Sequence, residues 1–172
     1  MLKLATPFLS VGMVLLATAS LSALTATSFT PDRGFRGITS VCVRVETLDL
    51  DFPTDTLEEE LAKRLTTAGV PTVAPDDCFK SVDQAAVVVW LKGSPSSSGR
   101  LYAYEVDISL QQGVALLRDP SYHVDNATTW ENWKIGLCQS AALNTELRAR
   151  AIELIDMFAD IYKGEHLRPH KK

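Results

Sequence analysis

The 172-residue sequence predicts an α/β (α+β) domain in which a mixed five-stranded sheet carries two main helices. In the first half of the chain, runs rich in β-branched residues alternate with a helical pattern. Three strand-like runs then follow one another, and a long amphipathic pattern closes the chain. The predicted order is β-α-β-(α)-β-β-β-α, with a parallel opening pair and a later antiparallel meander.

The N-terminal residues have the three zones of a secretory signal. Lys3 supplies the positive charge, residues 8–16 are apolar, and the small residues Ala17-Thr18-Ala19 form a cleavage site, with a later one at Ala26-Thr27-Ser28. Ser, Thr and Gly interrupt the apolar run, which falls short of the roughly 18 residues that a spanning helix needs. Residues 1–26 are therefore predicted to be a signal peptide, and the mature chain, without a transmembrane span, is expected to be periplasmic or secreted.

Composition limits the classes of partner and the number of domains. Loss of Lys3 with the signal changes the formal net charge from −4 to 16 − 21 = −5, which argues against a nucleic-acid partner. About 145 to 150 residues remain, which is enough for one domain with its own core. We predict a flexible lead over residues 27–37, a single α/β domain over residues 38–164 and a basic tail over residues 165–172.

The first strand and helix have the clearest patterns. In "ITSVCVRVE", valines at alternate positions predict a strand that is well covered on one face. In "LEEELAKRLTTAG", leucines at helical spacing predict a helix that begins with a capping box of Thr56 and Glu59. Gly69 is placed for a left-handed C-terminal cap.

The middle of the chain predicts two further strands of different character. "VPTVAP", residues 70–75, is expected to be a short edge strand, because Pro71 cannot donate to a ladder. Residues 77–85 have the pattern of a short helix or turn. "AVVVWLKG", residues 86–93, is apolar at almost every position, which is typical of a central strand covered on both faces.

The second half predicts a long hairpin followed by the closing helix. Apolar residues fall on even positions from Tyr102 to Leu116, which favours one strand to about residue 117 over a turn at residues 111–113. Residues 118–126 make the reversal, and "ATTWENWKI" returns as the last strand. A helix is expected from about Gln139 to Lys163, with its core face formed by Leu143, Leu147, Ala151, Leu154, Phe158 and Ile161.

This order, together with the export signal and the phrases "LEEELAKRLTTAGV", "QAAVVVWLKG" and "LYAYEVDISLQQGVALL", resembles a group of bacterial envelope domains. The group includes the N-terminal domain of the translocation protein TolB, the curli secretion lipoprotein and the lipoprotein activators of penicillin-binding proteins. "ATTW" followed by "AIELIDMFADIY" is also similar to exported bacterial proteins of unassigned function. The resemblance implies a non-enzymatic protein that docks to another envelope protein, assembles into rings or other homo-oligomers, or binds an envelope polymer. The sequence lacks the cysteine that anchors the lipoprotein members.

The last strand carries the candidate interaction site. Trp130 and Trp133 have opposite parity, so a regular strand cannot place both toward the core. Trp133 shares its face with Ile135 and Ala127 and is expected to face the core. Trp130 shares the more polar face with Thr128, Asn132 and Lys134, where it either packs under a loop or forms the centre of a contact surface. As the end of the meander, this strand is also expected to leave one edge open for strand addition.

The three cysteines permit one disulfide and one free thiol. Cys78 and Cys138 both follow predicted strand ends at one sheet edge, whereas Cys42 lies within a strand. The number of cysteines does not choose among the three pairings, but if a disulfide forms, the positions favour Cys78–Cys138, with Cys42 as a buried thiol.

No catalytic residue, metal ligand or cofactor is predicted. His123 and Asp125 lie in a reversal without a defined nucleophile. The acidic loops at residues 49–55 and 76–77 lack the ligand spacing of a calcium loop. The alternative to an interaction module is a secreted enzyme or a small-ligand or glycan-binding protein, in which these loops and His123 form a cleft.

Overall fold

The computed structural model describes residues 32–35 and 37–167. The predicted signal peptide and residues 168–172 of the predicted tail lie outside the described residues. In chain order the main elements are β1 (Ser40–Leu48), α1 (Thr54–Thr67), β2 (Gln84–Pro95), β3 (Leu101–Leu116), β4 (Asp119–Gln139) and α2 (Leu143–Leu167). Three short 3-10 helices connect them: η1 (Asp32–Phe35), η2 (Pro75–Asp77) and η3 (Ser140–Ala142).

The strands form one mixed sheet in the order β1-β2-β3-β4, with β1 and β2 parallel and the other pairs antiparallel. The α/β class, the two helices and the parallel opening are confirmed, but the prediction of five strands is wrong. Residues 70–75 form only an isolated bridge, between Val41 and Thr72. Pro71 and Pro75 on either side of that bridge have no N–H to donate, so the ladder does not extend.

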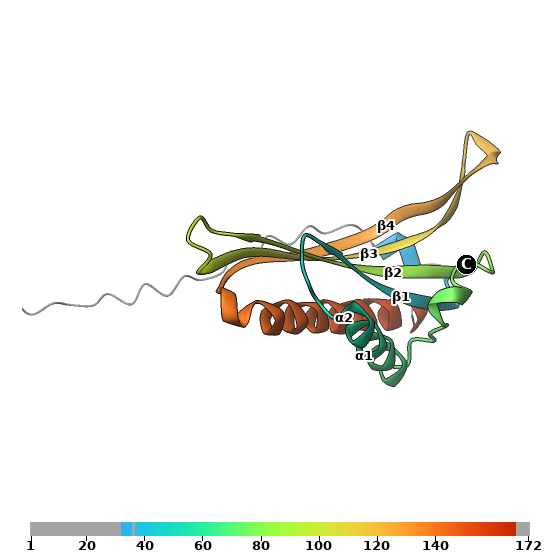
Figure 1. Cartoon of the computed structure of the whole chain (residues 1–172). Helices are drawn as coiled ribbons and strands as arrows, with labels where there is room; N and C mark the ends of the chain where they lie inside the picture. The colour runs from blue at the N-terminus through green and yellow to red at the C-terminus, as the bar shows by residue number, and fades with distance from the viewer. Residues whose placement is uncertain (1–31, 36, 168–172) are drawn as a thin grey trace, which may run out of the picture.

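Both helices cover the same face of the sheet (Figure 1). Alternate residues of the strands point toward them, because side chains in a strand alternate between the two faces. The row Val43, Val87, Leu110 and Trp130 runs straight across the four strands and is fully or almost fully buried. We call the opposite side of the sheet the open face. The core face predicted for the closing helix is confirmed for Leu143, Leu147, Ala151, Leu154 and Phe158, and Ile161 is partly buried.

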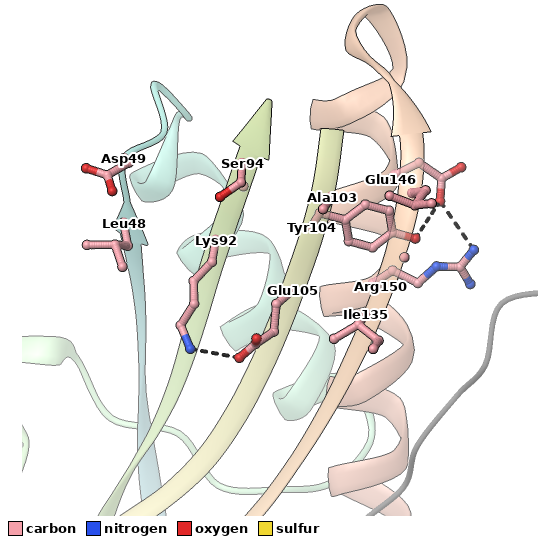
Figure 2. Close-up of a pocket in the computed structure, with 13 residues that line it drawn as sticks. Leu48, Asp49, Lys92, Ser94, Ala103, Tyr104, Glu105, Ile135, Glu146 and Arg150 are labelled. Carbon is pink, nitrogen blue, oxygen red and sulfur yellow. Dashed lines mark hydrogen bonds and ion pairs between the residues drawn. The ribbon is translucent and has the colours of Figure 1, made fainter. Parts of the chain in front are cut away.

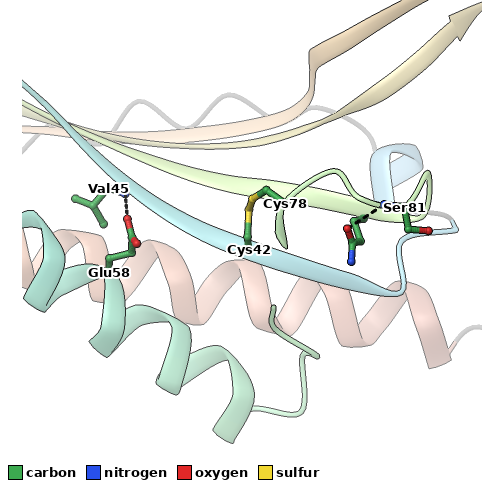
Figure 3. Close-up of a disulfide and its surroundings, with 6 residues drawn as sticks. Cys42, Val45, Glu58, Cys78 and Ser81 are labelled. Carbon is green, nitrogen blue, oxygen red and sulfur yellow. Dashed lines mark hydrogen bonds between the residues drawn. A yellow bond between two sulfur atoms is a disulfide. The ribbon is translucent and has the colours of Figure 1, made fainter. Parts of the chain in front are cut away.

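Two predictions about the first part of the domain need correction. Residues 32–35 of the predicted flexible lead form η1, and Phe35 is fully buried against the rings of Trp130 and Phe158. The predicted capping box is absent, because α1 begins at Thr54 and has no side-chain cap. Glu58 instead accepts a hydrogen bond from the backbone N–H of Val45, which ties the helix to β1 (Figure 3).

The predicted end of the first helix is confirmed. Gly69 has a φ of 88°, in the left-handed region that favours glycine. Its N–H donates to the carbonyl of Thr66, and the N–H of Val70 donates to the carbonyl of Leu65. These two bonds satisfy carbonyls that the last turn would otherwise leave without partners.

The disulfide joins Cys42 to Cys78, with a Cα–Cα distance of 5.7 Å, and not Cys78 to Cys138 (Figure 3). The bridge at Thr72 carries the following segment across the open face of β1, where Cys42 points. Cys138 lies on β4, at the other edge of the sheet. It is a free thiol, and burial raises its pKa. The predicted pairing fails because it assumed that residues 70–75 were a strand within the ladder.

Candidate interaction site

The residues predicted to form a contact surface on the last strand do not share one face. Trp130 is only 4% exposed, and its ring centroid lies 5.7 Å from that of Phe35 and 5.6 Å from that of Phe158. Asn132 is also buried, and its amide nitrogen contacts the sulfur of Met157 at 3.4 Å. Both side chains face the helices, so Trp130 is a core residue.

A β-bulge explains this reversal. Leu110 pairs with Trp130 and Gln111 with Thr128, which leaves Thr129 as an extra residue in β4. Thr128 and Trp130 have the same parity in the sequence but lie on opposite faces. Thr128 is exposed and lies on the open face.

The same reversal moves the residues that follow the bulge. Lys134 faces α2 and forms an ion pair with Glu153. Trp133 and Ile135, predicted to face the core, lie on the open face. The prediction that this strand ends the sheet is confirmed, although η1 covers the edge near Thr129: a Cβ added to Gly34 would lie 2.7 Å from the Thr129 carbonyl oxygen.

A groove of about 860 Å³ lies at the end of the sheet where β2 and β3 are joined (Figure 2). Three of its lining side chains are large, apolar and exposed: Leu48 at 52%, Ile135 at 44% and Leu137 at 59%. Exposed apolar groups of this kind in one place are typical of a contact surface. The groove is therefore the first candidate surface for binding a partner.

Polar groups line the same groove in neutralised pairs. Lys92 on β2 forms an ion pair with Glu105 on β3 at 2.8 Å, and this hydrogen bond raises the pKa of Lys92. At the β4 side, Glu146 accepts hydrogen bonds from Tyr104 at 3.5 Å and from Arg150 at 3.2 Å. Figure 2 shows both pairs projecting among the apolar side chains. The groove thus has charged side chains but little unbalanced charge between these partners.

The second candidate surface is a two-stranded arm formed by residues 113–127. β2 pairs with β3 only as far as Gln112, so beyond that point β3 and β4 have only each other as partners. The arm projects from the body of the molecule (Figure 1). Leu117 is fully exposed, Tyr122 is 58% exposed and Val124 is 36% exposed.

Sequence reasoning found the length of β3 but missed the arm. The even parity from Tyr102 to Leu116 predicts one long strand, which is confirmed. Because β3 has 16 residues and its neighbour β2 has 12, β3 must extend beyond the end of β2. That difference in length was the available signal. The groove has no comparable signal, because it depends on the register between strands.

The structure does not bring His123 and the acidic loops together. Residues 49–55 follow the C-terminal end of β1, whereas residues 76–77 lie beside Cys78, which is bonded to Cys42 near the start of β1. From Cys42 to Asp49 the strand spans about 23 Å. His123 is exposed on the arm, opposite Ala115. The cleft of the alternative hypothesis is therefore not formed by these residues.

Within residues 32–35 and 37–167, no group of three or more His, Cys, Asp or Glu side chains is arranged to hold a metal ion. In the same residues, no helix has the length and apolar character needed to cross a membrane.

No protein-family model and no curated protein matches the sequence. Among solved structures, the chain is similar to a PelC dodecamer from Paraburkholderia phytofirmans, with 12% sequence identity. The similarity covers 78% of this chain and 96% of that chain, with a TM-score of 0.48. The resemblance to TolB and the envelope lipoproteins remains a prediction from the sequence.

Proposed function

We propose that this protein is a non-catalytic interaction module of the bacterial envelope that assembles with copies of itself, the arm of one copy lying in the groove of the next. The observation that carries the proposal is the arm, whose apolar residues Leu117, Tyr122 and Val124 have no partner surface among the described residues. Monomeric proteins rarely keep such side chains exposed together. A second copy supplies a surface that covers them.

The groove has the complementary character. It is concave and has exposed apolar side chains, and four of its five charged side chains are already paired: Lys92 with Glu105 and Arg150 with Glu146. Apolar side chains of the arm therefore enter it without separating a buried ion pair. Arm and groove lie at opposite ends of β3: from Glu105 to Gly113 the strand spans about 26 Å. A contact between two different surfaces of one chain joins copies head to tail into rings or open filaments, unless two copies exchange both contacts in a symmetric dimer.

Two features support action outside the cytoplasm. The first 26 residues have the pattern of a secretory signal. The Cys42–Cys78 disulfide belongs to the oxidising compartments reached by exported proteins. We therefore propose a periplasmic or secreted location, and sequencing of the exported chain should find a new N-terminus after Ala19 or at the later site, residues 26–28.

Light scattering and sedimentation of the exported chain test the proposed contact. We expect oligomers that dissociate when Leu117 and Tyr122 are changed to Ser, or when Leu137 in the groove is changed to Ser. The matched control is Val82→Ser, because Val82 is fully exposed outside both surfaces. Exposed substitutions of this kind should change the free energy of unfolding by no more than about 0.5 kcal/mol.

A mixing experiment distinguishes a contact between arm and groove from a contact between two arms or two grooves. An arm variant still has an intact groove, and a groove variant still has an intact arm. Mixing the two should therefore form dimers, each with one good contact, and no larger species. A wild-type chain that stays monomeric at high concentration contradicts the proposal, and so does an oligomer that the arm and groove variants leave intact.

A further inference from the structure

The open face carries two tryptophans in one row of the sheet. Trp90 on β2 pairs with Asp107 on β3, and Asp107 pairs with Trp133 on β4. Residues that pair directly across strands project from the same face, with Cβ atoms about 5 Å apart. The two indoles therefore stand about 10 Å apart at their Cβ atoms, one on either side of a carboxylate. Both are partly exposed, as is Asp107.

The carboxylate between the tryptophans lacks a partner. Within the described residues, Asp107 accepts no side-chain hydrogen bond and forms no ion pair; the nearest cation, Lys92, is paired with Glu105. Burial raises the pKa of Asp107, Lys92 opposes this effect, and Glu131 and Glu105 add to it. An acidic group that is partly desolvated and shares its nearby cation with a second carboxylate is costly, and a further positive charge would offset that cost.

A second polar group beside this row is also without a partner. Ser109, two residues along β3 on the same face, is only 6% exposed, and no described residue hydrogen-bonds its hydroxyl. Buried polar side chains usually have a partner, so an orphaned hydroxyl needs an explanation. It lies between Val88 and Glu131, in the row next to that of the two tryptophans, so its hydroxyl borders the space beside Asp107.

Acidic residues outnumber basic residues on the open face around this row. The strand residues of the open face include the acids Glu46, Glu105, Asp107 and Glu131 and the bases Arg44 and Lys92, so the sum is 2 − 4 = −2. Indole faces attract cations through their quadrupole, most strongly where water is excluded. The ligand favoured by the two indoles, by the carboxylate between them and by the surrounding acids is therefore a cation.

From this juxtaposition we propose that Trp90, Asp107 and Trp133 form a binding site for an organic cation, an ammonium or guanidinium group. The group lies between the indoles, with its charge over the Asp107 carboxylate and a polar hydrogen or water on Ser109. The cation comes either from a small quaternary ammonium compound or from a lysine or arginine side chain of a partner polypeptide. The site lies on a different part of the sheet from the arm and does not depend on self-assembly.

The indole N–H signals of the exported chain in ¹H–¹⁵N spectra test this site directly. The chain has three tryptophans, and Trp130 in the core is an internal reference. Choline is the first probe, and 3,3-dimethyl-1-butanol, which has the same shape without the charge, is its control. We expect choline to shift the signals of Trp90 and Trp133 in a saturable way and to leave Trp130 unchanged, and we expect no effect of the neutral alcohol.

Variants show which groups bind the probe. Asp107→Asn and Trp133→Leu should each weaken binding about tenfold. Glu59→Gln removes the same charge from an exposed position on α1 and should change nothing. An unchanged Trp130 signal shows that each variant is folded, and if one variant fails to fold the other still decides.

Further probes identify the source of the cation. Short peptides with a single lysine or arginine that bind more tightly than choline indicate a partner polypeptide, and the reverse order indicates a small quaternary ammonium compound. The proposal is overturned if none of these cations shifts Trp90 and Trp133, if the neutral alcohol acts as well as choline, or if Glu59→Gln weakens binding as much as Asp107→Asn.

Discussion

The two faces of the sheet are built from the same four strands but differ in nearly every physical property. The face under α1 and α2 buries aliphatic rows and an aromatic group of Phe35, Trp130, Phe158 and Tyr162. Among the described residues, the open face is covered at the β1–β2 half, by the segment that Cys78 fixes to Cys42. The rest of it carries two partly exposed tryptophans and an excess of acids. Stability is concentrated on the first face, and the surfaces available for recognition lie on the second and on the arm.

Trp130 and Trp133 provide the sharpest test of this difference, because they are neighbours on one strand and point to opposite faces. Trp130→Ala removes a buried indole between two phenylalanines and should lower the free energy of unfolding by about 3–5 kcal/mol. Trp133→Ala should lower it by about 1 kcal/mol or less. Urea unfolding of both variants measures the difference, and equal losses would show that the open face is as much a core as the other.

The disulfide tests how the open face keeps its partial cover. Cys42 and Cys78 are 36 residues apart, and a crosslink over a loop of that length stabilises by about 3–4 kcal/mol in the chain-entropy description. A Cys42→Ala, Cys78→Ala double variant should lose an amount of this order, seen as a lower thermal midpoint. Cys138→Ala is the matched control and should have little effect. Peptide mapping that links Cys138 to either cysteine contradicts the assignment.

Gly136 on β4 lines the groove and pairs with Tyr104, whose side chain points to the helix-covered face. A Cβ at this position would lie 2.4 Å from the Tyr104 hydroxyl oxygen, so Gly136→Ala must displace the ring. Overpacking of this kind typically costs about 1–3 kcal/mol. Gly113→Ala, where nothing lies within 4 Å, is the control. In a Tyr104→Leu background the Gly136→Ala change should cost little, and an unchanged cost there would rule out this contact as the cause.

The sequence allowed the helix-covered face to be predicted better than the open face. Leucines at helical spacing in α1 and alternating valines in β1 are local patterns with one physical meaning, and both are confirmed. The even parity of β3 likewise predicted its full length. These features depend only on residues close together in the chain, which is the range that periodicity describes.

The candidate sites depend on a β-bulge, a loop and the register between strands, which the periodicity of the sequence does not describe. One bulge at Thr129 reversed the faces of Trp130 and Trp133, because a single extra residue moves every later side chain to the other side. Pro71 and Pro75 prevented a fifth strand, and the resulting loop moved the disulfide to Cys42. The row of Trp90, Asp107 and Trp133 exists only through the register of three strands.

The smallest expected effect concerns the ion pairs that hold the two helices together on the covered face. Arg64 on α1 donates to both carboxylate oxygens of Asp156 on α2, at 2.5 and 2.8 Å. These hydrogen bonds lower the pKa of Asp156 below its usual range, although burial opposes the effect. The folded-state pKa of Asp156 is thus below the unfolded value of about 3.9. The pair therefore stabilises the fold above that pH, and this contribution disappears as the pH falls through the folded-state pKa.

Both side chains of the Arg64–Asp156 pair are nearly half exposed, so water screens the interaction and its effect on stability should be small. Carboxyl-carbon NMR should show Asp156 titrating below the usual range of an aspartate in the wild type and at a higher pH in Arg64→Gln. Asp156→Asn should be slightly less stable than the wild type at pH 7 and no less stable at pH 2. A wild-type advantage that persists at pH 2 would mean that Asp156 contributes by packing and not by its charge.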